Sequence, residues 1–195
     1  NAYKEQIISD IDSIVLELMV SKDIYDIKNN EFSNSSNRPK SYNPEIRDHA
    51  RYNELVNKAL YSFLDFNKDA IIIGEDIEES NQYTPNDYGG AFKVTKSLST
   101  QFPDRVLNTP ISEAAIVGVC AGYSIKAGRS IVEIMFGDFS TLIFDQILQH
   151  VTKFELMYNS IVKCPLIIRT PMGGKRGYGP THSQSLEKHF IGIPN

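Results

Sequence analysis

The chain has 195 residues, of which 41% are hydrophobic and 23% charged. This is the composition of an ordinary globular protein, and it excludes collagen, a coiled coil and wholesale disorder. Its 20 basic and 24 acidic residues give a formal net charge of -4. The sequence lacks the clustered positive charge expected of a protein that binds nucleic acid or an anionic membrane.

The first 44 residues differ in character from the rest of the chain. Apolar residues recur at helical spacing over residues 3–20, and we expect a helix across 1–20. Residues 21–44 include an Asn- and Ser-rich stretch that cannot bury enough apolar surface to offset its ordering entropy, which predicts a flexible linker. Because the chain starts without Met and stops after an apolar run, we expect a piece of a longer protein, with the helix as the tail of an upstream domain.

Helical and strand patterns alternate over residues 45–195. Helices are predicted at about 52–63, 92–101, 114–126 and 138–158, and strands at 70–74, 106–107, 130–136 and 165–170. This alternation predicts an α/β fold, a parallel sheet with helices on both faces, here truncated at its C-terminus. Ligands bind such sheets beyond the carboxyl ends of the strands, which points to the loops at residues 74–90, 108–113, 136–139 and 170–183.

Glu113 starts the helix after the second predicted strand, with Ser112 in the N-cap position. An acidic residue in a first turn is common because it complements the helix dipole, by ~0.3–1 kcal/mol. The alternative is a carboxylate desolvated by apolar neighbours at the ligand-binding edge, where its raised pKa would suit proton exchange. The residues by themselves favour the first interpretation.

The later loops leave their alternatives open. Phe136 and Phe139 bracket a strand-to-helix junction and either pack in the core or stack on a planar ring. The glycine-rich segment 173–179 is not a Walker loop, because Arg176 follows Lys175 where Ser or Thr is needed; it is either a gating loop or an anion site. His182, at the end of this loop, is a candidate by its position.

Cysteine and metal patterns are uninformative about catalysis. Cys120 and Cys164 each lie in an apolar run and are expected to be buried, reduced thiols rather than a disulfide or a metal pair. The sequence has no metal-ligand spacing and no nucleophile elbow, and no apolar stretch reaches the ~18–20 residues of a membrane span.

Six ordered sequence blocks resemble one known family, the beta subunit of the thiamine-diphosphate-dependent decarboxylating component of 2-oxoacid dehydrogenases. The resemblance covers about residues 48–195 and takes in the pyruvate, branched-chain 2-oxoacid and acetoin types. It implies a pyrimidine-binding, transketolase-like domain. The blocks are residues 74–76, 89–95, 108–114, 132–139, 169–174 and 182–185.

This resemblance also implies roles for individual residues. Glu113 matches the glutamate that hydrogen-bonds the aminopyrimidine of thiamine diphosphate and promotes ylid formation. Phe139 matches the aromatic residue stacked on that ring, and Met135 a position lining the same pocket. His182 matches the active-site histidine that orients the substrate or assists acyl transfer to a lipoyl group. The backbone near Leu166 matches part of a monovalent-cation site.

The implied partners lie outside the chain. They are an alpha-type domain, in the same or a separate chain, that holds the diphosphate and Mg²⁺, and the lipoyl domain of an acyltransferase core. The implied assembly is a homo-oligomer or α2β2-like, in the bacterial cytoplasm or the mitochondrial matrix. No diphosphate motif occurs here, so we expect the chain by itself to be inactive.

Two other interpretations were weighed against this one. The amino-acid sequence at residues 109–113 and 182–184 argues against another transketolase-like enzyme. The joint presence of Glu113, Phe139 and His182 argues against a non-catalytic assembly module of the same fold.

Overall fold

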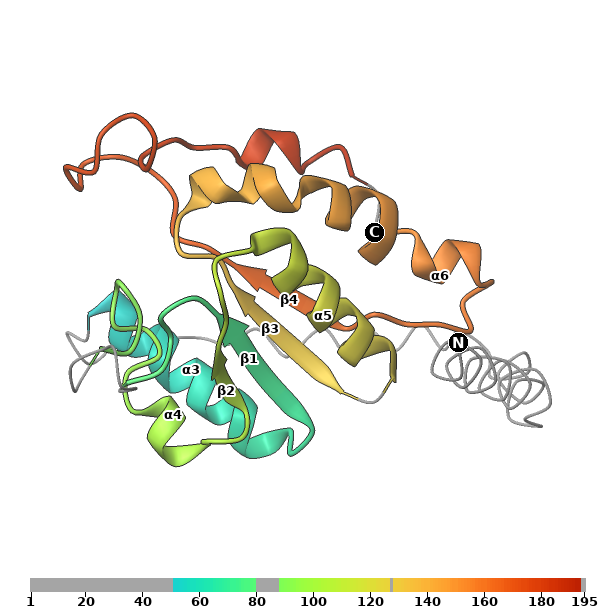
Figure 1. Cartoon of the computed structure of the whole chain (residues 1–195), viewed down its shortest axis with the longest axis horizontal. Coiled ribbons are helices and arrows are strands. Elements are labelled where there is room, and N and C mark those ends of the chain that lie inside the picture. The colour runs from blue at the N-terminus through green and yellow to red at the C-terminus, as the bar shows by residue number, and fades with distance from the viewer. Residues whose placement is uncertain (1–50, 80–87, 127, 194–195) are drawn as a thin grey trace, which may run out of the picture. The chain divides into compact units, whose positions relative to one another are not determined.

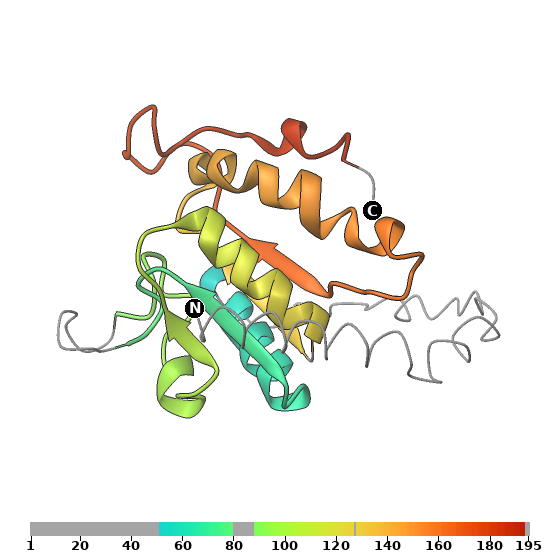
Figure 2. The ribbon, with the colours of Figure 1, turned by 45° about the vertical axis from the view of Figure 1, so that its right-hand side comes forward.

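A computed structural model of the chain describes residues 51–79, 88–126 and 128–193. In these residues the strands β1 (Ala70–Gly74), β2 (Val106–Asn108), β3 (Arg129–Glu133) and β4 (Leu166–Arg169) form one parallel sheet in the order β2-β1-β3-β4 (Figure 1). Helix α3 (Tyr52–Phe66) covers one face of the sheet, and helix α5 (Glu113–Lys126) covers the other (Figure 2). The predicted α/β fold is confirmed. The predicted helix at 1–20 and linker at 21–44 lie outside the described residues.

Strand β1 is buried along its whole length. Ala70 and Ile72 face the α3 side, whereas Ile71 and Ile73 face the α5 side, because successive side chains of a strand alternate. A strand covered on both faces is recognisable as a continuous apolar run, which is why its predicted bounds match the observed ones.

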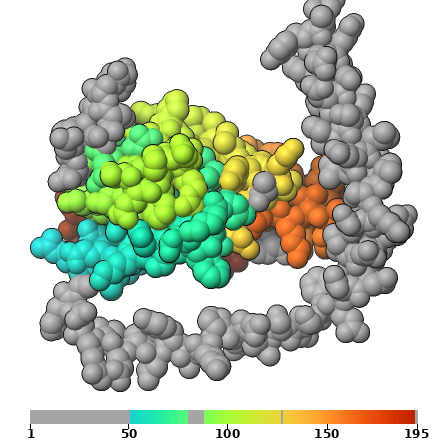
Figure 3. All heavy atoms as spheres, turned by 90° about the horizontal axis from the view of Figure 1, so that it is seen from below, coloured from blue at the N-terminus to red at the C-terminus, as the bar shows by residue number. Residues whose placement is uncertain are grey.

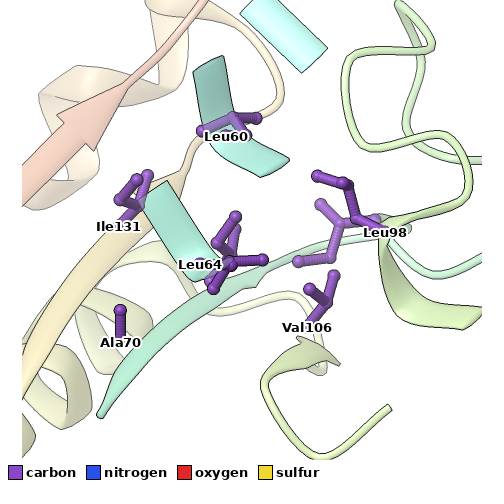
Figure 4. Close-up of a cluster of buried hydrophobic side chains, with 8 residues drawn as sticks. Leu60, Leu64, Ala70, Leu98, Val106 and Ile131 are labelled. Carbon is purple, nitrogen blue, oxygen red and sulfur yellow. The ribbon is translucent and has the colours of Figure 1, made fainter. Parts of the chain in front are cut away.

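The α3 side of the sheet holds the first hydrophobic cluster. Helix α3 begins after Arg51, whose N–H donates to the Glu54 carboxylate at 3.2 Å. Its buried Leu60 and Leu64 pack on the sheet together with Leu98 of the short helix α4 (Leu98–Gln101), so α3 and α4 lie side by side (Figures 3 and 4). The remaining members of the cluster are Ala70, Ile72, Ile77, Val106 and Ile131.

The α5 side holds the second cluster, in which Ile116, Val117 and Cys120 of α5 meet the apolar side chains of β1 and β3. Cys120 is buried and Cys164 is half-buried, and both are free thiols. The prediction of reduced thiols is confirmed, while full burial holds for Cys120 alone of the two. Burial raises the pKa of the Cys120 thiol to about 11.

The predicted helix at residues 92–101 is wrong over its first part. Residues 92–97 form turns, because Lys93 and Ser97 have φ angles of 61° and 63°, which lie outside the right-handed helical region. The helical segment α4 therefore starts at Leu98. The predicted strand 130–136 is also too long, since β3 ends at Glu133 and the chain turns at residues 135–136.

The predicted helix at 138–158 is broken into shorter segments. They are the 3₁₀ segment η2 (Gly137–Ile143), the π-helical segment η3 (Gln146–Val151) and the helix α6 (Phe154–Met157). The backbone N–H of Thr152 bonds to the carbonyl of Ile147 at 3.2 Å, and its hydroxyl bonds to the same carbonyl at 3.0 Å. This pairing over five residues widens the turn.

After β4 the chain runs back beside η2 and η3 to the 3₁₀ turn η4 (Glu187–His189) (Figures 1 and 2). Phe190, directly after η4, packs against Phe144 with the ring planes tilted by 58° and the centroids 5.6 Å apart. Within the described part of the chain, no helix combines the length and apolar character needed to cross a bilayer.

Candidate functional site

The loops that carry the predicted site residues leave one edge of the sheet, where its parallel strands end. Glu75 comes directly after β1, whereas Glu113, Phe139 and His182 lie further along the segments that follow β2, β3 and β4, respectively. The chain passes from β1 to β2 on one side and then crosses to β3 on the other. Open parallel sheets bind ligands beyond the carboxyl ends of the strands at such a reversal.

Two buried carboxylates lie together at this edge. Glu75 and Glu113 are each 8% exposed, and Glu113 is the first residue of α5. Burial raises the pKa of Glu75, and the negative charges of Glu113 and Asp76 raise it further, while a hydrogen bond from the Ser112 backbone opposes them. Oε1 of Glu75 has no hydrogen-bond partner among the described residues.

Glu75 is a candidate site residue to which the sequence reasoning gave no role. Its block was part of the family resemblance, but no role was attached to it. The available signal was an ionisable residue placed directly after a strand whose five residues are all apolar or glycine. A carboxylate in that position must either find a partner or be held for a ligand.

His182 packs edge-on against two phenylalanine rings. Its ring centroid lies 4.9 Å from that of Phe136 and 5.3 Å from that of Phe139, and the two phenylalanines are 5.7 Å apart. Nδ1 of His182 is 2.8 Å from the hydroxyl of Thr181. The structure thus brings together two predicted site residues, Phe139 and His182, that are far apart in the sequence.

Segment η2 connects this aromatic cluster to α5. Phe139 is partly buried against the second hydrophobic cluster, which contains Ile116 one turn after Glu113, and η2 packs against α5. Met135 is half-buried in the turn between β3 and η2, directly before Phe136. A planar ligand ring at this edge would therefore meet a carboxylate from α5 and an aromatic face from η2.

The loop after β4 is fixed to the turn after β3. The N–H of Gly137 donates to the carbonyl of Pro171 at 2.8 Å. A side chain at position 137 would overlap Met172, so glycine is required there. The buried carboxylate of Asp138 accepts hydrogen bonds from Nε2 of Gln184 at 2.6 Å and from its backbone N–H at 3.4 Å.

A buried ion pair joins β3 to β4 at the same edge. Nη2 of Arg169 donates to Oε1 of Glu133 at 2.7 Å, and Nε lies 2.7 Å from Oε2. Burial raises the pKa of Glu133 to about 7 against the opposing effect of the Arg169 charge. Arg169 also borders a pocket of about 730 Å³, whose other lining residues are Tyr52, Asn53, Val56, Phe92, Val94, Thr170, Pro171, Met172, Arg176 and Tyr178.

Leu166 lies at the other end of the sheet. It is the first residue of β4 and pairs with Ser130 near the start of β3, whereas Arg169 pairs with Glu133 at the ligand-binding edge. The structure therefore does not bring Leu166 together with Glu113 or His182. The described ranges contain no group of three or more His, Cys, Asp or Glu residues that could hold a metal ion.

Residues 48–195 match the family described as the pyrimidine binding domain of transketolase. The chain belongs to this family. The transketolase-type pyrimidine-binding domain thus includes all the described residues, and the loops beyond its parallel strands are those that carry Glu113, Phe139 and His182.

Curated relatives of this pyrimidine-binding domain come from bacteria and eukaryotes. The chain is 31% identical over 139 residues to the 3-methyl-2-oxobutanoate dehydrogenase subunit beta of Mycobacterium tuberculosis, covering 71% of the chain and 38% of the relative. It is 33% identical over 142 residues to the mitochondrial pyruvate dehydrogenase E1 component subunit beta of Saccharomyces cerevisiae, covering 72% and 37%.

A third relative is the acetoin:2,6-dichlorophenolindophenol oxidoreductase subunit beta of Cupriavidus necator. It is 35% identical to the chain over 141 residues, covering 71% of the chain and 42% of the relative. The chain thus spans about two fifths of the length of the curated relatives it matches.

Proposed function

We propose that this chain forms the pyrimidine-binding part of a thiamine-diphosphate-dependent 2-oxoacid dehydrogenase. The observation that carries the proposal is the buried carboxylate of Glu113 at the first position of α5, on the ligand-binding edge of a domain from a pyrimidine-binding family. The beta-subunit relatives, named for pyruvate, branched-chain and acetoin oxidation, support the reaction class.

The residues at the edge fit an aminopyrimidine ring. A ring nitrogen is a weak base, and a buried carboxyl group at this edge is a hydrogen-bonding partner for such a base. The orphaned Oε1 of Glu75 shows that this carboxylate cluster retains unused hydrogen-bonding capacity. The half-buried ring of Phe139 supplies a surface on which a planar heterocycle can stack.

The chain's own residues then have separate tasks. Glu113 holds the proton at the ring nitrogen, Phe139 orients the ring, and Met135 lines the same pocket. When bound, thiamine diphosphate supplies the nucleophilic carbon that attacks the 2-oxo group. His182 orients the substrate or assists acyl transfer to a lipoyl group. The Leu166 backbone, at the far end of the sheet, contributes to a structural monovalent-cation site.

The rest of the active site belongs to partners. An alpha-type domain, in the same or a separate chain, supplies the diphosphate and Mg²⁺ ligands, and the acyl group passes to a lipoyl domain. The assembly is a homo-oligomer or α2β2-like. Choice among 2-oxoacids depends on a few methylenes, worth ~1–3 kcal/mol, and on residues that the partner contributes.

This division of the site makes a prediction for the 195-residue chain by itself. We expect neither tight binding of thiamine diphosphate nor turnover, because the diphosphate ligands are missing. Isothermal calorimetry with thiamine diphosphate and Mg²⁺ measures this directly. Micromolar affinity for the isolated chain would contradict the proposed division.

Substitution of Glu113 tests the proposed function in the complete enzyme, with its alpha-type domain present. Glu113→Gln removes the proton-holding group at little change in volume, and we expect a loss of about 10²- to 10⁴-fold in turnover. Turnover of pyruvate, 2-oxoisovalerate and acetoin is followed with an artificial electron acceptor. Glu187→Gln, at an exposed position, is the matched control. Near-normal activity of the Glu113→Gln enzyme would refute the assignment.

A further inference from the structure

We propose that the Asp138–Gln184 hydrogen-bonded pair is a clasp that holds His182 in its working orientation. The inference rests on the proposed function, in which His182 acts on the substrate or the acyl group. Asp138 and Gln184 are positioning residues in this account, since they act through His182.

The geometry of Asp138 is more specific than an acidic residue at a helix start requires. An acidic side chain in a first turn is stabilised by the helix end even when it points to solvent. Asp138 instead is 8% exposed, and both of its carboxylate oxygens face one residue of the loop after β4. Gln184 donates to Oδ1 through Nε2 at 2.6 Å and to Oδ2 through its backbone N–H at 3.4 Å.

The clasp closes the far end of a loop whose near end is already fixed. At the near end the N–H of Gly137 bonds to the carbonyl of Pro171. At the far end, besides the clasp, the N–H of Gly173 bonds to the carbonyl of Gln184 at 3.3 Å. Both ends of the segment from Pro171 to Gln184 are thereby tied to Gly137 and Asp138, the first two residues of η2.

The interior of this loop contacts the domain through Arg176, whose guanidinium lies 4.5 Å from the centroid of the Phe92 ring, and through Tyr178, whose ring centroid lies 5.2 Å from that of Phe136. Residues 174–181 are exposed, and Gly177 and Gly179 adopt positive φ angles of 80° and 78°. Ordering an exposed, glycine-rich segment costs conformational entropy, which ring contacts of about 0.5–1.5 kcal/mol each offset in part. His182 follows this segment and precedes Gln184 by two residues, so the clasp is the nearest side-chain anchor on its C-terminal side.

Release of the clasp therefore acts on the contacts of His182 with Phe136 and Phe139. Those ring contacts are weak individually, about 0.5–1.5 kcal/mol each, and do not fix a loop by themselves. A displacement of about 1 Å in a positioning element costs on the order of 10²-fold in rate. Loss of the clasp should lower kcat without weakening cofactor binding, since neither clasp residue lies at the Glu113 carboxylate.

The test uses variants of the complete enzyme that remove or retain the clasp. Asp138→Leu removes both bonds of the clasp, whereas Gln184→Met removes the shorter bond from Nε2 and leaves the backbone N–H able to donate to Oδ2. Both should lower kcat about 10- to 100-fold with the apparent affinity for thiamine diphosphate unchanged. Asp138→Asn keeps one acceptor for Nε2 of Gln184 but turns its amide nitrogen toward the Gln184 backbone N–H, so it should lower kcat less than Asp138→Leu does. Gln149→Met, at an exposed position, is the matched control.

A second arm separates positioning of His182 from a general structural effect. In a His182→Ala background, Gln184→Met should lower kcat less than about twofold further, because the group it positions is gone. An equal effect of Gln184→Met with and without His182 would overturn the proposal, as would wild-type kcat in both clasp variants.

A third readout is independent of turnover. In the complete enzyme labelled with ¹³C at histidine Cε1, the His182 signal carries a ring-current shift from Phe136 and Phe139, and Gln184→Met should move it toward the position of free histidine. An unmoved signal overturns the clasp. If the wild-type enzyme oxidises no 2-oxoacid, the proposed function fails, and this signal still decides the clasp.

Discussion

Glu133 should make the stability of the domain depend on pH in a direction opposite to that of most carboxylates. It is 7% exposed at the end of β3, and burial raises the pKa of its carboxyl group from 4.5 to about 7, despite Arg169. Between these two values the folded protein binds more protons than the unfolded chain does. The free energy of unfolding therefore falls as the pH rises from about 4.5 to 7 and is level above that.

The magnitude follows from the same difference. A shift of roughly 2.5 pKa units, at 1.36 kcal/mol per unit, gives a contribution of about 3 kcal/mol. This stabilisation is fully present below the unfolded pKa and is lost once the pH passes the folded pKa. Glu133→Gln has no titrating group, so it removes this pH dependence and leaves that of the other carboxylates in place.

Urea unfolding of the 195-residue chain, followed by circular dichroism at a series of pH values, measures the difference between wild type and Glu133→Gln. We expect the wild-type advantage to shrink by about 3 kcal/mol between pH 4.5 and 7.5. The corresponding difference for the exposed Glu187→Gln should stay flat. A wild-type advantage that grew with pH would show that pairing with Arg169 outweighs burial, and the reasoning would be wrong.

Two further predictions concern the cores on either side of the sheet. Leu64→Ala, at a fully buried position of α3, should lower the free energy of unfolding by about 2–5 kcal/mol. Leu55→Ala, at a position on the same helix that is 50% exposed, should change it by less than about 1 kcal/mol. Equal effects of the two substitutions in urea unfolding would contradict the packing. With a maleimide at pH 7, Cys164 should be modified before Cys120, whose thiol is buried and has a pKa of about 11; faster labelling of Cys120, identified by peptide mass, would contradict its burial.

The elements that the sequence predicts well are those in which one physical effect dominates. Residues 70–74 are an apolar run because the strand is covered on both faces, and so short an apolar run is typical of few other structures. Residues 92–97 belong to a predicted helix that the structure does not form there, because Lys93 and Ser97 adopt positive φ angles. Asn57 reaches across from α3 and donates to the carbonyls of Val94 and Lys96, each at 2.9 Å. Such long-range hydrogen bonds to loop carbonyls produce no periodic pattern in the sequence.

The site divides in the same way. The position of Glu113 at the ligand-binding edge follows from strand order and loop position, so the predicted elements were sufficient to place it. The packing of His182 on Phe136 and Phe139 depends on the course of a glycine-rich loop, which no local rule determines. Glu75 was overlooked because its burial, the largest cause of its raised pKa, and the nearby charge of Glu113 both arise from packing between segments distant in sequence.

The buried carboxylates at this edge of the sheet meet the cost of burial in three different ways. Glu133 has the guanidinium of Arg169, and Asp138 has the two N–H groups of Gln184. Glu75 lies near Glu113, so that like charge adds to desolvation instead of opposing it; Oε1 of Glu75, like Oε2 of Glu133, has no hydrogen-bond partner among the described residues. A buried carboxylate beside another carboxylate costs more stability than one beside a cation or two N–H donors, and a basic, hydrogen-bonding ligand would recover that cost. That difference is the physical reason to place the ligand at Glu75 and Glu113 and to assign Asp138 and Glu133 to the scaffold.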